Sequence, residues 1–272
     1  LVFTSPDSIR PLSQRVRYNS ELQSLDSTIQ DYYGMGKGQV ESLNGRKLHN
    51  LGFMGQGMTI AVLDAGFMNV DKIPAFKNLN IKGTRNFVAG YDNDVYKEMD
   101  HGTKTLSTIA MNQPTVFVGT APKASFWLLR TEDYLIESSA EEDFWIAAVE
   151  FSDSVGVDVI SSSLGYHGFD DKSMNYRYSD LNGKTALISQ AASRLASKGI
   201  ILVNSAGNDG MGTWKKINVP ADAHDILTVG AVSLDKVNAP FSSIGPAADG
   251  RVKPDVMAFG CPTNVVSGRG YI

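Results

Sequence analysis

The sequence is poor in the residues that build disulfide frameworks and zinc sites. It has a single cysteine, Cys261, in 272 residues, so no disulfide can form within the chain. The four histidines, His49, His101, His167 and His224, are scattered, and no His-Glu-x-x-His or zinc-type Cys/His spacing occurs. The sequence therefore excludes a disulfide-stapled fold and gives no support to a metallohydrolase.

Long apolar runs and an excess of positive charge are also missing. No run reaches the roughly 18 apolar residues that a membrane-spanning helix needs, so we expect no membrane span. The 25 Lys and Arg residues against 29 Asp and Glu give a net charge of −4, without the basic excess typical of nucleic-acid binding. The first ten residues are mixed and polar and are not a signal peptide. Because the chain starts with Leu1 instead of Met, we expect a processed or trimmed product.

The composition is that of a globular protein, with 42% hydrophobic and 20% charged residues. A chain of 272 residues suits one large α/β domain. Up to about Gly57 the sequence is polar, with a weak helical pattern over 12–25 and a glycine-rich stretch over 34–38 that predicts a flexible break. We interpret this part as an extension or wrapping arm.

From Met58 onward, short apolar runs alternate with helical patterns. The runs predict buried strands over 59–63, 126–129, 157–160, 200–203 and 228–232. Apolar residues at helical spacing predict helices over 101–111, 141–154 and 187–196. This alternation indicates an α/β fold with a mainly parallel sheet covered by helices on both faces, a three-layer αβα arrangement.

Polar residues lie at the ends of three of these elements, where the binding and catalytic sites of parallel sheets are found. Asp64 ends the first strand, His101 opens a helix, and Asn208 lies in the turn after the fourth strand. Each is also compatible with a simple turn or surface position. The positive end of a helix disfavours a charged imidazole, so its position favours a neutral His101 that can accept a proton. An Asn amide can donate to developing negative charge.

Taken together, the segments Asp64-Ala65-Gly66, His101-Gly102-Thr103 and Ser205-Ala206-Gly207-Asn208 resemble the subtilisin-like serine proteases, the subtilases. Further segments in the family's order are Gly55-Gln56-Gly57, Gly119-Thr120-Ala121-Pro122, Ser162-Ser163-Leu164-Gly165, Phe241-Ser242-Ser243-Ile244-Gly245 and Lys253-Pro254-Asp255-Val256-Met257-Ala258-Phe259-Gly260. The resemblance begins at Gly55 and runs to the end. It divides the chain into an N-terminal arm or pro-segment remnant over 1–54 and a C-terminally incomplete subtilase catalytic domain over 55–272.

The resemblance implies a serine endopeptidase of subtilisin-like fold that cleaves polypeptides through an Asp-His-Ser triad. Asp64 would orient His101, His101 would act as the base, and Asn208 would donate to the oxyanion. Substrate would lie as an added strand along Ser163, Leu164 and Gly165. Ala206 and Gly207 would line one wall of the main specificity pocket.

The family's nucleophile block, Gly-Thr-Ser, does not occur in the sequence. Gly-Thr is found at 83, 102, 119 and 212, and none of these pairs is followed by Ser. We expect the nucleophilic serine to lie beyond residue 272, and Ser205 is not a substitute because it matches a structural position of the family. Residues 1–272 alone are therefore expected to be inert towards peptides.

The main alternative is a catalytically inactive, subtilase-like protein that binds peptides. A nicotinamide-dependent dehydrogenase does not fit, because Gly55-Gln56-Gly57 precedes the first strand instead of following it. The family implies no required cofactor and no metal in the catalytic site, but structural calcium is common in it, although no segment has EF-hand spacing. It also implies a secreted or extracytoplasmic protein. We expect Cys261 to be a small, buried or half-buried thiol and not a nucleophile.

Overall fold

The computed structural model describes residues 32–272, and the helical pattern over 12–25 lies outside these residues. Within them, seven strands form one sheet in the order β2-β5-β1-β6-β7-β8-β9, and every neighbouring pair is parallel. Their bounds are β1 Thr59–Asp64, β2 Asn80–Asn86, β5 Ser125–Arg130, β6 Val159–Ser162, β7 Ile201–Ser205, β8 Leu227–Ser233 and β9 Val256–Cys261. The predicted parallel sheet is confirmed.

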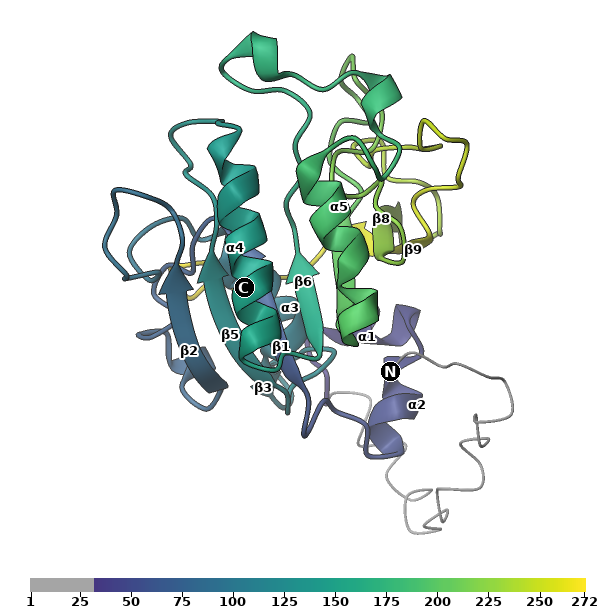
Figure 1. Ribbon diagram of the computed structural model, residues 1–272. Coiled ribbons are helices and arrows are strands. Elements are labelled where there is room, and N and C mark those ends of the chain that lie inside the picture. Colours follow the sequence, from purple (N-terminus) through teal and green to yellow (C-terminus); the bar gives the residue numbers. More distant parts are fainter. Residues whose placement is uncertain (1–31) are drawn as a thin grey trace.

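Helices cover both faces of this sheet. Helices α4 (Ala140–Ser154) and α5 (Leu187–Arg194) pack on one face, and α3 (His101–Ala110) lies on the other (Figure 1). The predicted helices are therefore present with nearly their expected bounds. The three-layer α/β architecture of a subtilisin-like fold is confirmed.

Alternate side chains of the central strand β1 pack into the two hydrophobic cores, one on each face of the sheet. Ala61 and Leu63 pack in the core under α4 and α5, whereas Ile60 and Val62 pack in the core under α3. Because both faces are covered, the strand reads as a continuous apolar run without polar alternation. The run ends at Asp64, at the edge where the carboxyl ends of the parallel strands meet.

The segment that precedes β1 packs against the domain. Helices α1 (Lys37–Ser42) and α2 (Gly45–Asn50) follow a bridge between Gly34 and Phe117, the first residue of β4 (Phe117–Val118). Tyr33 and Val40 are buried with Val118 in a small core. A Cβ at Gly36 would collide with the Val118 carbonyl oxygen. The predicted flexible break over 34–38 is therefore wrong: these glycines allow close backbone approach.

Two strands of the sheet were not predicted. β2 forms one edge, and its sequence, Asn-Ile-Lys-Gly-Thr-Arg-Asn, is mostly polar and half-exposed, so no apolar run marks it. β9 forms the other edge, and all of it but Cys261 lies in the Lys253–Gly260 segment noted above. The remaining elements are short: β3 Asn112–Gln113, which pairs with β4, and the 3-10 turns η5 Pro74–Phe76, η6 Lys172–Met174, η7 Tyr178–Asp180 and η8 Ala196–Lys198.

Candidate active site

The structure brings Asp64 and His101 into direct contact. Asp64 is fully buried at the end of β1, and its Oδ1 lies 2.8 Å from Nδ1 of His101, the first residue of α3. Since a carboxylate only accepts hydrogen bonds, Nδ1 carries the proton in this pair. The contact needs Gly102, because a Cβ there would collide with the Gly66 carbonyl oxygen and lie 2.9 Å from the Asp64 Cβ.

Two further donors hold the Asp64 carboxylate in place. The Ala65 amide donates to Oδ1 over 2.8 Å, and the Thr105 hydroxyl donates to Oδ2 over 3.1 Å. The sequence analysis did not identify Thr105. Its position four residues after His101, on the same face of α3, is the signal that could have found it.

The contact with Asp64 also dominates the electrostatics of His101. The hydrogen bond to Asp64 raises the pKa of His101 above its ordinary value, and burial of the ring opposes this shift to a lesser extent. The largest influence on the His101 pKa is thus the Asp64 carboxylate, and the expected effect of the helix N-terminus on this ring stays a prediction. With Nδ1 bound to Asp64, Nε2 is left to exchange a proton with a substrate or a nucleophile. Among residues 32–272, no serine hydroxyl hydrogen-bonds to His101.

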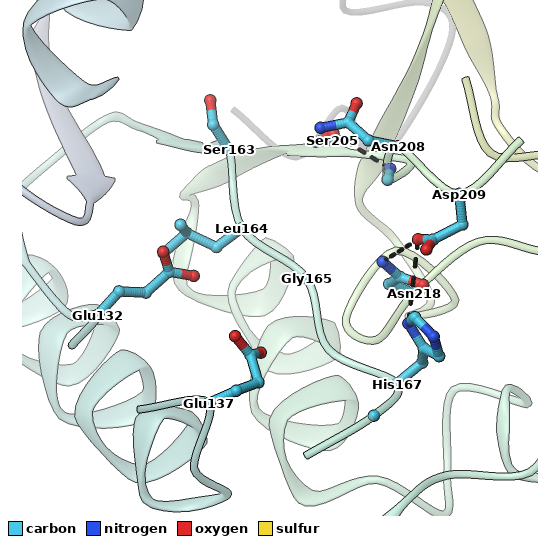
Figure 2. Close-up of a pocket in the computed structure, with 12 residues that line it drawn as sticks. Glu132, Glu137, Ser163, Leu164, Gly165, His167, Ser205, Asn208, Asp209 and Asn218 are labelled. Atoms are coloured by element: carbon cyan, nitrogen blue, oxygen red, sulfur yellow. Dashed lines mark hydrogen bonds and ion pairs between the residues drawn. The ribbon is translucent and has the colours of Figure 1, made fainter. Parts of the chain in front are cut away.

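Two adjoining cavities lie beside this pair. The His101 cavity, of about 520 Å³, is lined by His101 and Ala65 and by residues of the 132–137 loop. The Asn208 cavity, of about 440 Å³, contains Asn208, and both cavities share Glu132, Glu137 and Ser163 (Figure 2). The two therefore form one continuous cleft along the carboxyl edge of the sheet.

The residues predicted to bind substrate lie at this cleft with one exception. Ser163, Leu164, Gly165 and Gly207 line the Asn208 cavity, with the 163–165 segment running through its middle (Figure 2). Ala206 does not line it: its side chain is buried in the core under α4 and α5. The next residue, Gly207, has a φ of +109° and lies at the cavity instead.

Asn208 is exposed, and its side-chain amide makes no hydrogen bond within the described part of the chain. Its donor is therefore free for a ligand. The Ser205 hydroxyl makes a local contact within the same turn: it accepts a hydrogen bond from the Gly207 amide over 3.1 Å. This bond stabilises the turn that presents Asn208 and agrees with a structural position for Ser205.

The cleft also contains charged residues that the sequence analysis missed. Glu132 and Glu137 line both cavities, and Asp209 lines the Asn208 cavity, where its Oδ2 accepts from Asn218 Nδ2 over 2.9 Å. Burial raises the pKa of Glu132 to about 8, with a further contribution from the nearby Asp64 carboxylate. Glu132 follows the end of β5, so the strand-end rule that identified Asp64 would have found it too.

Glu141 holds the loop that carries these carboxylates. Its carboxylate accepts from the amides of Asp133, over 2.7 Å, and Ser138, over 3.2 Å. Burial nevertheless raises the pKa of Glu141 to about 7. The loop wall of the His101 cavity is thus fixed by a side chain at the start of α4.

No group of three or more His, Cys, Asp or Glu side chains that could hold a metal ion is found among residues 32–272. The calcium site that the resemblance allows stays a prediction. In the same part of the chain, no helix has the length and apolar character needed to cross a membrane. Cys261 is half-buried and unpaired with another cysteine.

Comparison with known proteins agrees with this geometry. Subtilisin NAT from Bacillus subtilis subsp. natto is 29% identical over 212 residues, which cover 77% of this chain and 50% of the relative. Subtilisin Savinase from Lederbergia lenta is 28% identical over 202 residues, 74% of this chain and 65% of the relative. The chain thus spans about half the length of the first curated relatives it matches.

A solved structure, that of the prenylagaramide maturation protease PagA, shares the fold with a TM-score of 0.61 at 21% identity, covering 84% of this chain and 71% of that one. The sequence model of the subtilase family matches residues 55–270, most of the chain. The match begins where the apolar strands begin and includes every residue of the cleft described above. This chain belongs to the subtilase family.

Proposed function

We propose that this protein is a serine endopeptidase and that residues 55–272 supply the aspartate, the histidine and the oxyanion donor of its active site. The observation that carries the proposal is the 2.8 Å contact between the buried Asp64 and His101, which leaves His101 Nε2 free beside a cleft. The nucleophile is a serine on sequence beyond residue 272. The substrate is a polypeptide, and family resemblance favours a secreted or extracytoplasmic location.

In the proposed reaction, the serine oxygen attacks the carbonyl carbon of the peptide bond while His101 Nε2 takes the hydroxyl proton. The carbonyl electron pair moves to its oxygen, and the Asn208 amide donates to this oxyanion. When the C–N bond breaks, His101 returns the proton to the leaving amine. Water then repeats the same steps on the acyl-enzyme and releases the acid.

Asp64 acts through His101 in this scheme. It holds the Nδ1–H tautomer and stabilises the imidazolium that forms during proton transfer. Its complete burial and its bonds from Ala65 and Thr105 fix the orientation of the carboxylate. The substrate backbone would pair along the 163–165 segment. Gly165 has no side chain, so the substrate can approach the backbone closely there.

The test uses the complete gene product and a serine-directed fluorophosphonate. We expect one labelled serine outside residues 1–272, hydrolysis of a peptide substrate, and loss of both in His101→Ala. Residues 1–272 by themselves should hydrolyse no peptide. Peptide binding by the complete product without labelling or hydrolysis would instead identify the inactive, peptide-binding alternative.

A further inference from the structure

Two carboxylates in the cleft have no partner. Glu132 and Glu137 both line the two cavities, and neither side chain makes a hydrogen bond or ion pair with any residue in 32–272. Figure 2 shows both carboxylates pointing into the space beside Leu164. By contrast, Asp170 at the same cleft accepts from the Glu137 amide over 3.2 Å.

The surroundings of these carboxylates are negative as well. Burial raises the pKa of Glu137, with an additional contribution from Asp170. Glu132 faces the carboxylates of Asp64, Glu141 and Glu137, whereas the nearby His101 opposes their effect on its pKa. No lysine or arginine of the described residues lines either cavity. Ionising the half-buried Glu132 is costly unless a counter-charge enters, whereas Glu137 is exposed and available to the same cation.

An independent feature of the Asn208 cavity also lacks a partner. Asn218 is only 6% exposed and lines this cavity, and its Nδ2 donates to Asp209. Its Oδ1 is buried and accepts no hydrogen bond from the described residues. A buried acceptor without a donor is uncommon in folded proteins. The cavity therefore offers acceptors at both ends, two free carboxylates at one and the Asp209–Asn218 pair at the other (Figure 2).

We propose that this cleft binds polypeptide segments carrying lysine or arginine side chains, with Glu132 and Glu137 as the main partners of the cation. The inference rests on the proposed protease function for the assumption that a polypeptide occupies the cleft. It adds the chemical class of the substrate. A guanidinium group suits this site, because it presents five donors to carboxylate and amide oxygens.

The test measures binding without chemistry. All proteins carry His101→Ala, so hydrolysis cannot interfere. The probes are two fluorescent hexapeptides, Ala-Ala-Arg-Arg-Ala-Ala and the same peptide with citrulline, the uncharged isostere, in place of both arginines. We expect the arginine peptide to bind at least tenfold more tightly by fluorescence anisotropy. The difference should shrink at high ionic strength, because salt screens the charges.

Substitutions locate the partners of the cation. Glu132→Gln and Glu137→Gln should each reduce the ratio between the two affinities several-fold, and the double variant should bring it close to one. Glu150→Gln is the matched control, since Glu150 is exposed on α4 and should leave the ratio unchanged. Circular dichroism checks the fold of each variant. If the double variant does not fold, the two single variants decide.

Equal affinities for the two peptides, absence of binding by both, or a ratio that persists in the Glu132 and Glu137 variants would overturn the inference. The outcome is separable from that of the proposed function. Charge-selective binding by a protein whose complete form labels no serine supports the inference and rejects the protease. Hydrolysis by the complete protein with no preference for basic peptides does the reverse.

Discussion

Replacing Asp64 by Asn isolates the charge of the Asp–His pair from its shape. The asparagine Oδ1 can keep the contacts with His101 Nδ1 and the Ala65 amide. Its Nδ2 would then face Thr105, whose hydroxyl already lies 3.1 Å from the Gly102 carbonyl oxygen and can donate there while accepting from Nδ2. Every hydrogen bond therefore has a replacement, and only the negative charge is lost.

The expected effect follows from the state of His101. Its pKa is raised by the bond to Asp64, so this stabilisation is fully present below the unfolded pKa of about 6.5 and is lost as pH rises through the folded pKa. A hydrogen bond to a charged group contributes about 1.5–3 kcal/mol, against about 1 kcal/mol for a neutral one. Because the His101 side chain is 49% exposed, water screens the pair, and we take about 1 kcal/mol as the difference.

The measurement has two parts. An NMR titration of the His101 ring should show a lower pKa in Asp64→Asn than in the parent protein. Thermal unfolding at pH 5 should show a Tm lower by about 2–4 °C, the shift that about 1 kcal/mol causes in a domain of this size, and a smaller gap at pH 9. Asp143→Asn, an exposed change on α4, is the control. An unchanged pKa of His101, or an equal Tm gap at both pH values, would refute the reasoning.

Three further predictions concern the same edge of the sheet. In the complete protein, Asn208→Ala should lower kcat by about 10²–10³ and leave Tm unchanged, because the exposed amide makes no internal hydrogen bond; a Tm loss would contradict this. Gly102→Ala should destabilise the fold by a few kcal/mol and shift the His101 NMR signals. Gly38→Ala is the control and should be neutral or stabilising, because the nearest atoms to a new Cβ lie 3.7 Å away. Glu132→Gln should increase the stability at pH 9 relative to the parent, on the order of 1 kcal/mol after allowance for solvent screening, and much less at pH 5. The reason is that the Glu132 pKa of about 8 is raised in the folded state, so ionisation between pH 4.5 and 8 costs stability there; equal gains at both pH values would contradict it.

The local signals predicted the central elements because burial on both faces leaves a readable apolar run. β1 and β5 are such runs, whereas β6, β7 and β8 alternate in burial but contain short apolar stretches, and all five were predicted near their actual bounds. β2 was missed because an edge strand is half-exposed and needs few apolar residues. The glycines at 34 and 36 were misinterpreted because glycine permits both flexibility and close approach, and sequence alone does not distinguish the two.

For the site, the sequence identified residues whose position at a strand or helix end is itself the signal. Asp64, His101 and Asn208 are of this kind. Glu137 and Asn218 come from irregular segments with no periodicity, and they reach the cleft only through the packing of those segments. Ala206 lies next to Gly207 in the sequence but is buried in the core, and the residue types alone do not tell which of the two faces the cavity.

The sequence by itself determined the class of fold and the chemistry at the ends of its strands, since periodicity and strand-end polarity are local properties of the chain. Only the tertiary structure decided the neighbours of each strand. The order β5-β1-β6-β7 places the ends carrying Glu132, Asp64, Ser163 and Asn208 along one edge. That order depends on contacts between segments far apart in the chain, and so does the negative charge gathered in the cleft.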